Sequence, residues 1–178
     1  MKLKLDLHTH PFEISHFERA SVSTVGKLLD AVVAKGLDGI GVTEHFSLKY
    51  GMEVKRIADE HFPDAGVLLI PGHEIEMEGQ EVVELYLADG VVFRFLAHPG
   101  HPRQSIFIDE RFHGIEYQNG MHNWHINKPL VKKVAEEHDL MILTNSDAHY
   151  LDQIGVYYNE IDLDELTQKV EQRSKRVV

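Results

Sequence analysis

The chain has 178 residues, a formal net charge of −11, 43% hydrophobic residues and no cysteine. This length and apolar content predict one domain with a single core, and the lack of cysteine excludes a disulfide framework, a cysteine nucleophile and thiolate metal ligands. The negative charge argues against a basic face that grips duplex nucleic acid. No stretch reaches the roughly 18 apolar residues of a membrane span, and the first residues enter a strand without an apolar signal segment. We therefore expect a cytoplasmic protein that does not bind membranes.

The first predicted strand leads directly into a pair of histidines. The alternating residues 2–5 are followed by Asp6-Leu7-His8-Thr9-His10. Because successive side chains of a strand point to opposite faces, His8 and His10 share one face and could chelate a metal ion together.

Four later apolar runs also end in residues that bind metal ions. Residues 39–43 run into Glu44-His45, 67–70 into His73-Glu74, 93–97 into His98, and 140–144 into Asp147 and His149. In a parallel α/β barrel the carboxyl ends of the strands converge on the face where active sites are built, so these side chains are expected to meet in a metal site. One such histidine alone is more often an ordinary polar residue, and the alternative is a domain whose histidines only hydrogen-bond to one another.

Helical spacing of apolar residues alternates with these runs. It predicts helices over residues 21–35, 52–61, 128–138 and 162–173. The first begins at residues suited to capping and stops at Gly36, and the last has acidic residues at its start and basic residues toward its end, as the helix dipole favours. The chain is therefore predicted to be of the α/β class.

The ordered motifs resemble those of the PHP (polymerase and histidinol phosphatase) superfamily of metal-dependent phosphoesterases. They are His8-Thr9-His10, Gly-Val-Thr-Glu-His at 41–45, Pro-Gly-His-Glu at 71–74, Ala-His-Pro at 97–99 and Ser-Asp-Ala-His at 146–149. The resemblance covers residues 3 to about 160. It implies a single PHP-type catalytic domain over residues 1–178, built as a distorted seven-stranded (β/α) barrel with two or three divalent metal ions at its mouth.

The resemblance also implies a set of ligands for each metal. The first metal would lie among four side chains: His8, His10, Glu74 and Asp147. Glu74 would bridge to a second metal, which His98 also binds, and three histidines would bind the third: His16, His45 and His149. Imidazole with carboxylate suits zinc, manganese or iron, and the ligand types do not choose among them.

Two positions depart from the family pattern. Glu44 stands where the family usually has aspartate, and no histidine lies between Glu74 and His98, where the family commonly supplies another ligand of the second metal. Glu84, flanked by apolar residues, is either the substitute ligand or a solvent-facing residue of a half-buried strand.

The implied reaction is hydrolysis of a small, anionic phosphorylated or nucleotide-like substrate, with a hydroxide between the metals as the nucleophile. Glu74, Asp147 and His149 would serve the catalytic centre. His101 and Arg103 closely follow His98, and the planar guanidinium of Arg103 suits a phosphate, so both are candidates for substrate binding, although a loop arginine is often only a surface residue. Trp124 could stack on a base, but a lone tryptophan more often packs.

Two other functions are compatible with the sequence. Barrels with similar clusters also cleave amide or ester bonds, and a catalytically decayed domain could keep only metal binding. Arg103 and the family likeness favour a phosphoester, and the nearly complete ligand set speaks against decay.

Overall fold

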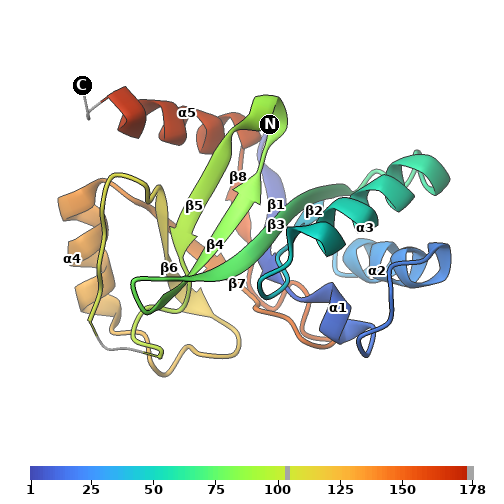
Figure 1. Cartoon of the computed structure of the whole chain (residues 1–178), viewed down its shortest axis with the longest axis horizontal. Helices are drawn as coiled ribbons and strands as arrows, with labels where there is room; N and C mark the ends of the chain where they lie inside the picture. The colour runs from blue at the N-terminus through green and yellow to red at the C-terminus, as the bar shows by residue number, and fades with distance from the viewer. Residues whose placement is uncertain (103–104, 176–178) are drawn as a thin grey trace.

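The computed structural model describes residues 1–102 and 105–175. These residues form one mixed sheet of eight strands in the order β7-β6-β5-β4-β3-β2-β1-β8, flanked by helices (Figure 1). The strands are β1 (Leu3–Thr9), β2 (Gly39–Val42), β3 (Leu68–Met77), β4 (Gln80–Tyr86), β5 (Val92–Leu96), β6 (Gly114–Asn119), β7 (Met141–Asn145) and β8 (Asn159–Ile161). The helices are α1 (Pro11–Ile14), α2 (Val22–Ala34), α3 (Leu48–His61), the 3-10 turn η1 (Ala88–Gly90), α4 (Lys128–His138) and α5 (Leu163–Ser174).

The sheet curls into a nearly closed barrel. Strands β1, β2 and β3 run parallel, as do β5, β6 and β7, whereas β4 is antiparallel to both of its neighbours and β8 is antiparallel to β1. The barrel prediction is therefore confirmed in its coarse form. The predicted count of seven strands is wrong: the part of the chain described here has an eighth, β8, which is too short to give a pattern in the sequence.

Side chains close the gap between the two edge strands, β7 and β8. The side-chain amide of Asn159 donates to the carbonyl of Thr144 (2.9 Å) and to Asn145 Oδ1 (2.9 Å), and its Oδ1 accepts from the amide of Thr144 (2.9 Å). Further along, the amide of Asp147 donates to the carbonyl of His8 (2.9 Å). These bonds satisfy backbone groups that would otherwise be unpaired edges.

The barrel interior is packed with apolar side chains at the end away from the strand tips. This interior cluster consists of Leu5, Leu7, Ile70, Val83, Leu85, Phe93, Phe95, Ala97, Leu143, Ile161 and Leu166. Leu166 belongs to α5, which lies across the end of the sheet where the chain begins (Figure 1). With one end plugged by apolar residues, the carboxyl ends of the parallel strands are left to form a polar mouth.

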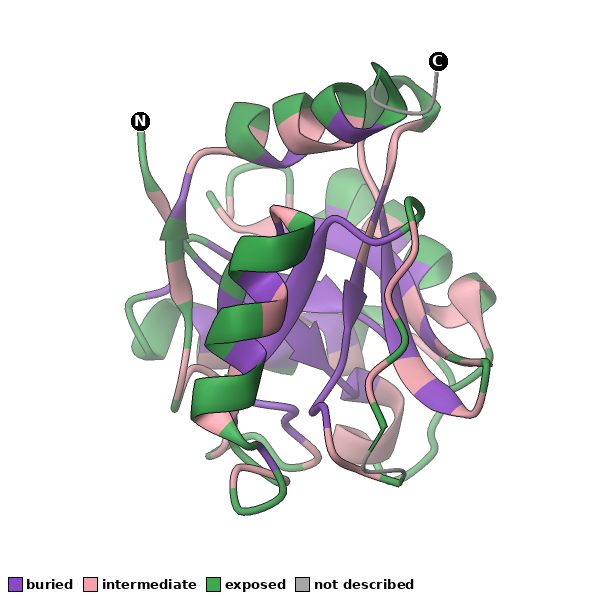
Figure 2. Ribbon diagram, turned by 90° about the vertical axis from the view of Figure 1, so that its left-hand side faces the viewer, coloured by how far each residue is buried: buried purple, intermediate pink, exposed green. Residues whose placement is uncertain are grey.

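The other helices cover the outer side of the sheet, and burial is concentrated on the strands and on the helix faces turned toward them (Figure 2). Helices α2 and α3 pack against β2 and β3 through a second cluster that includes Val25, Leu29, Ile40 and Ile57. Helix α4 packs near β6 and β7 in a third cluster that includes Ile115 and Val131. None of the helices in the described residues is long and apolar enough to cross a membrane.

The helix predictions agree with the structure, apart from one boundary. Ser21 caps α2 through a capping box with Thr24, and α4 spans the predicted residues. Helix α3 begins at Leu48 rather than at Met52, because its first turn is only partly buried and carries little apolar signal.

Strand β3 also differs from the expectation that each ligand follows the end of a strand. It continues to Met77 and turns back into β4, so Glu74 lies within the strand, opposite Val83. The long hairpin carries Glu74 into the mouth of the barrel from the middle of a rigid element.

Replacing Asn159 with alanine is expected to lower the free energy of unfolding by about 3 kcal/mol, because it leaves partly buried groups of Thr144 and Asn145 without partners. The control is Glu160→Ala, a change at the next and exposed residue, which should alter stability by less than about 0.5 kcal/mol. Urea unfolding of both variants measures the difference, and equal stability would mean that Asn159 does not close the barrel.

Candidate metal centre

Four side chains converge at the mouth of the barrel from β1, β3 and the loop after β7. His8 Nε2 lies 3.1 Å from His10 Nε2 and 3.5 Å from Asp147 Oδ1, and His10 Nε2 lies 3.0 Å from Asp147 Oδ1. Glu74 completes the group, with its oxygens 3.5 Å from His8 Nε2 and 3.7 Å from His10 Nε2.

These separations fit a metal ion. Ligands about 2.0–2.1 Å from a tetrahedral zinc lie about 3.3 Å from one another. All four residues are at most 2% exposed, so bulk water does not reach them. The backbone of Asp147 has the unusual φ of 54°. Such a conformation persists only where the surrounding structure fixes it, and it is common at functional sites. The first predicted ligand set therefore comes together in the structure.

The charges of this group also suit a cation. Burial alone would lower the pKa of His8, but the charges of Asp147, Glu74 and Glu116 raise it well above its usual value. Burial would likewise raise the pKa of Glu74, and His8, His45 and His98 hold it well below its usual value instead. The carboxylates therefore stay ionised and favour positive charge at this point, which a divalent ion would supply.

A buried carboxylate that the sequence did not single out fixes the group from behind. Glu116 on β6 is fully buried and lies 3.1 Å from His8 Nδ1. It also accepts hydrogen bonds from the backbone amide of His98 (2.7 Å) and from the side-chain amides of Asn119 (2.9 Å) and Asn145 (2.8 Å). A carboxylate bound to the far nitrogen of a histidine sets its tautomer and leaves Nε2 free to bind metal.

Asp6 positions the loop that carries Asp147 and His149. Its carboxylate accepts from the amides of Ser146 (3.0 Å) and Gly155 (2.9 Å), and its burial raises the pKa to about 6. The two ends of the loop are thereby tied to β1.

The second group lies on the other side of Glu74. Glu74 Oε1 is 3.0 Å from His98 Nε2, and Glu81 lies 3.7 Å from His98 Nε2 and 3.6 Å from His101 Nδ1. Glu81 is on β4, two residues before Val83, and therefore shares the face of the strand that points into the barrel. It occupies the place for which the sequence suggested Glu84.

The structure places Glu84 on the opposite, outer face of β4. Its carboxylate accepts from two of the three side-chain nitrogens of Arg94, Nε (2.7 Å) and Nη2. It also lies 2.9 Å from His73 Nε2 and 3.1 Å from the hydroxyl of Tyr86. Neither expected role, a metal ligand or a solvent-facing residue, describes this buried ion pair. The sequence could not show on which face of β4 Glu84 lies, because both faces are apolar around these positions.

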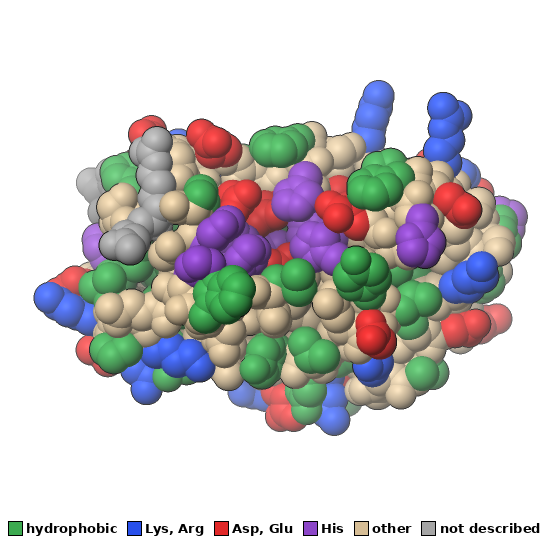
Figure 3. Space-filling view, turned by 90° about the horizontal axis from the view of Figure 1, so that it is seen from below, with side chains coloured by type: hydrophobic (Ala, Val, Ile, Leu, Met, Phe, Trp, Pro, Cys, Tyr) green, Lys and Arg blue, Asp and Glu red, His purple; other side chains and the backbone are tan. Residues whose placement is uncertain are grey.

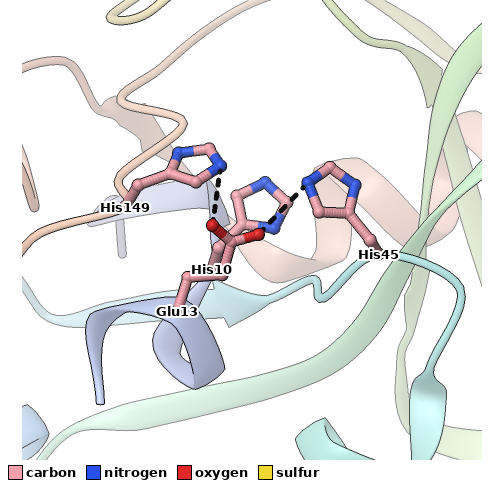
Figure 4. A group of neighbouring side chains, drawn as sticks. All are labelled: His10, Glu13, His45 and His149. Carbon is pink, nitrogen blue, oxygen red and sulfur yellow. Dashed lines mark ion pairs between the residues drawn. The ribbon is translucent and has the colours of Figure 1, made fainter. Parts of the chain in front are cut away.

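The third group contains His10, Glu13, His45 and His149, with ligand atoms within 4.8 Å of one another (Figure 4). Glu13 on α1 lies between two of the rings, 3.6 Å from His45 Nε2 and 3.8 Å from His149 Nε2. His149 Nδ1 lies 2.8 Å from the carbonyl of Asp147, which leaves Nε2 facing the group.

His16, the predicted ligand from this segment, is exposed in the turn after α1, where its backbone has a φ of 56°. Glu13 takes the corresponding place in the third group. Its spacing of three residues from His10, on a short helix, is the only local signal that could have pointed to it.

The structure describes one of the two candidate residues for substrate binding. Arg103 lies outside the described residues, and His101 stands at the end of the second group, near Glu81. A pocket of about 790 Å³ opens beside the third group, with Glu13 and His45 in its wall. It is also lined by two cationic residues, Arg19 and Lys49.

Viewed onto the mouth, histidine and acidic side chains gather in the middle of the surface (Figure 3). The ligand groups form a row in which neighbouring groups share a residue: His10, then His8, then His98, then His101. The last group adds His122 and His125, which follow β6 and were not assigned a role from the sequence. The rings of His98 and His122 lie 4.6 Å apart.

Residues 125–171 match the family model described as PHP-associated. No curated protein sequence matches the chain. The fold is similar to that of PsfC from Pseudomonas syringae, with a TM-score of 0.60 and 18% identity over 86% of this chain and 79% of that one.

Two further solved structures share the fold over nearly the whole length of both chains. One is a proposed metal-dependent phosphoesterase from Bifidobacterium adolescentis, with a TM-score of 0.65 and 12% identity over 95% of this chain and 96% of that one. The other is an amidohydrolase from Chromobacterium violaceum, which contains sulfate and no metal, with a TM-score of 0.62 and 13% identity over 93% of this chain and 96% of that one.

The two glutamates of β4 are expected to respond oppositely to substitution. Glu81→Gln should weaken metal binding by about tenfold or more and change stability little, because its carboxylate faces the second group. Glu84→Gln should keep the metal content and lower the free energy of unfolding by about 2 kcal/mol at pH 7, because Arg94 loses its charged partner. Metal titration and urea unfolding measure the two effects. Metal loss in Glu84→Gln would mean that Glu84, and not Glu81, faces the second group.

The effect of Glu84→Gln should also depend on pH. The hydrogen bond from His73, together with Arg94, lowers the pKa of Glu84 from 4.5 to about 2. A lowered pKa in the folded state adds stability above the pKa of the unfolded state, and this stability is lost as the pH falls toward the folded value. The difference in unfolding free energy between wild type and variant should therefore shrink between pH 4.5 and 2. Unfolding in the presence of a chelator checks this, and a constant difference would contradict it.

Proposed function

With residues 125–171 matching the PHP-associated family model, we propose that the chain is a PHP-type, metal-dependent hydrolase of small phosphoesters. The observation that carries the proposal is the convergence of His8, His10, Glu74 and Asp147, whose ligand atoms lie 3.0–3.7 Å apart in a buried mouth. A divalent cation would satisfy these imidazole and ionised carboxylate groups together.

Two or three divalent ions would be held along the row. The first would lie among His8, His10, Glu74 and Asp147, and Glu74 also faces His98 and so suits a shared ligand. Glu81 would add a carboxylate beside His98, and a third ion would lie among Glu13, His45 and His149. The mixture of imidazole and carboxylate suits zinc, manganese or iron.

When bound, such ions would lower the pKa of a water nucleophile and neutralise charge on the phosphoryl group. The chain itself orients the groups. Glu116 holds His8 with Nε2 toward the centre, and the carbonyl of Asp147 does the same for His149. Burial of the inner ligands excludes bulk water, which strengthens every charge interaction in the mouth.

The pocket beside the third group is suited to an anionic substrate. Arg19 and Lys49 line it together with the aromatic rings of Phe12, Phe17 and Tyr50. The rings of Phe12 and Tyr50 lie 5.0 Å apart and form an apolar wall. A phosphate near the metals could contact the two cations while the remainder of the molecule packs on the rings. These cations favour a phosphoester over a neutral amide or ester.

The metal and the reaction can be tested together on protein purified without chelator. Wild type is expected to contain two or three metal ions per chain and to hydrolyse an aryl phosphate. Glu74→Ala should lose bound metal, and its kcat/KM should fall by more than about 100-fold, the equivalent of about 2.7 kcal/mol of transition-state stabilisation.

Glu160→Ala, at an exposed residue on β8, should keep both properties. Hydrolysis of an aryl ester or an anilide without hydrolysis of the phosphate would replace the phosphoesterase proposal by the rival class of reaction. Absence of both activities in a metal-loaded wild type would indicate a binding domain.

Arg19→Ala is expected to raise the KM for the aryl phosphate by about tenfold, the equivalent of about 1.4 kcal/mol, with a smaller change in kcat. The matched control is Arg111→Ala, which removes an exposed arginine paired with Asp109 away from the pocket. Steady-state kinetics of both variants give the comparison, and equal KM values would exclude Arg19 from substrate binding.

A further inference from the structure

A second pocket lies at the other end of the ligand row from the pocket that contains Arg19 and Lys49. It has a volume of about 440 Å³ and lies beside the loops after β5 and β6, with a wall that includes Pro99, Ile106, Trp124, His125 and Leu130. The first pocket has His45 in its wall and the second has His125, so the row of ligand groups joins them. Hydrophobic side chains border the histidines on this face of the molecule (Figure 3).

We propose that the second pocket receives one arm of a phosphodiester, and that this arm ends in a flat ring that stacks on Trp124. The inference rests on the proposed function and specifies the substrate of that site. A phosphate at the proposed metals would lie between the two pockets, and only a diester has an arm for each of them. A monoester would leave one pocket empty.

The ring of Trp124 is the surface on which this arm would stack. Trp124 is the only tryptophan of the chain, it is 82% exposed, and its ring stands perpendicular to that of His125, with the ring centroids 5.2 Å apart. An indole ring left in water forgoes the stabilisation that burial would provide. A stacked ring would recover part of it, and stacking accepts many kinds of ring because each has a π-face.

The backbone holds Trp124 in place although its side chain is exposed. The amide of His125 donates to the carbonyl of His122 (3.0 Å), and Ile126 is buried in the cluster under α4. Gly100 has a φ of 107°, and a Cβ atom at this position would lie 2.4 Å from the carbonyl oxygen of His125, so the loops after β5 and β6 are in close contact. A ring on a fixed loop loses little freedom when a ligand binds.

The two pockets differ in the groups that they select. Arg19 and Lys49 line the first, whereas the described residues in the wall of the second include no lysine, arginine or carboxylate. Asn127 caps α4 by accepting from the amide of Leu130 (3.2 Å), which leaves its side-chain NH2 group as a donor at the second pocket. The second arm is therefore expected to end in an uncharged ring with hydrogen-bonding groups at its edge.

Hydrolysis of such a diester needs only water as co-reactant. The oxygen of the water bonds to phosphorus, the bond from phosphorus to the oxygen of one arm breaks, and one proton of the water ends on that oxygen. The products are an alcohol and a phosphomonoester. The monoester keeps one arm and its contacts with one pocket.

The test compares two substrates on the full chain purified without chelator. One is p-nitrophenyl phosphate, which has a single arm, and the other is the p-nitrophenyl ester of thymidine 5′-phosphate, which has a second arm that ends in a flat base. Wild type is expected to hydrolyse both and to have the lower KM for the diester. Trp124→Ala should lower kcat/KM for the diester by about tenfold and so reduce the ratio of diester to monoester activity. Trp124→Phe, which keeps a ring, should retain most of this ratio.

The control is Tyr158→Ala, which removes a partly exposed ring that lies against Lys4 of β1 rather than in either pocket. It should match wild type on both substrates. Hydrolysis of the monoester without hydrolysis of the diester, or a wild-type ratio in Trp124→Ala, would overturn the phosphodiester inference and leave the proposed function intact. Absence of both activities would overturn the two together.

Discussion

A carboxylate that is removed from water needs a partner at each of its lone pairs, and Glu116 finds these partners on four segments of the barrel. His8 from β1, the backbone of His98 after β5, Asn119 from β6 and Asn145 from β7 all meet its two oxygens. Loss of any one would leave a buried charge partly unsatisfied. The register of these strands and the orientation of His8 are therefore set by one network, which joins the closure of the barrel to the geometry of the mouth.

The mouth concentrates imidazoles and ionised carboxylates, and a divalent cation would offset the repulsion between the carboxylates. Imidazoles lie within stacking distance of one another, with the rings of His45 and of His149 each 4.4 Å from that of His10. Ionised Glu74 and Asp147 lie among them, and Asp147 adopts a left-handed backbone conformation. A metal ion bound only in the folded state would offset the electrostatic cost, and its binding free energy would add to the stability of the fold. The proposed function and the stability would then depend on the same residues.

The row of ligand groups has chemically different ends. At one end, Glu13, His45 and His149 border a pocket with two cations and an aromatic wall. At the other, His101, His122 and His125 lie beside the exposed Trp124, with Glu81 3.6 Å from His101 Nδ1. The centre around Glu74 lies between them and combines both ligand types. A substrate held at the first end would meet the proposed hydrolytic metals directly.

Short-range patterns in the sequence determined the class of the fold and the positions of the main helices. They also pointed to the candidate ligands His8, His10, Glu74 and Asp147. Each of these depends on neighbours within a few residues: a period, a cap, or a polar residue shortly after an apolar run. The tertiary structure alone decided the contributions of Glu13, Glu81 and Glu116. Glu81 and Glu84 lie on one strand with valines on both faces, and only the pairing of Glu74 with Val83 shows that Glu81 points inward. Glu116 follows no motif, since its partners lie up to 108 residues away in the chain. Which face of a strand is buried, and which distant donors meet a carboxylate, are properties of strand register and barrel closure, and no local stretch of sequence contains them.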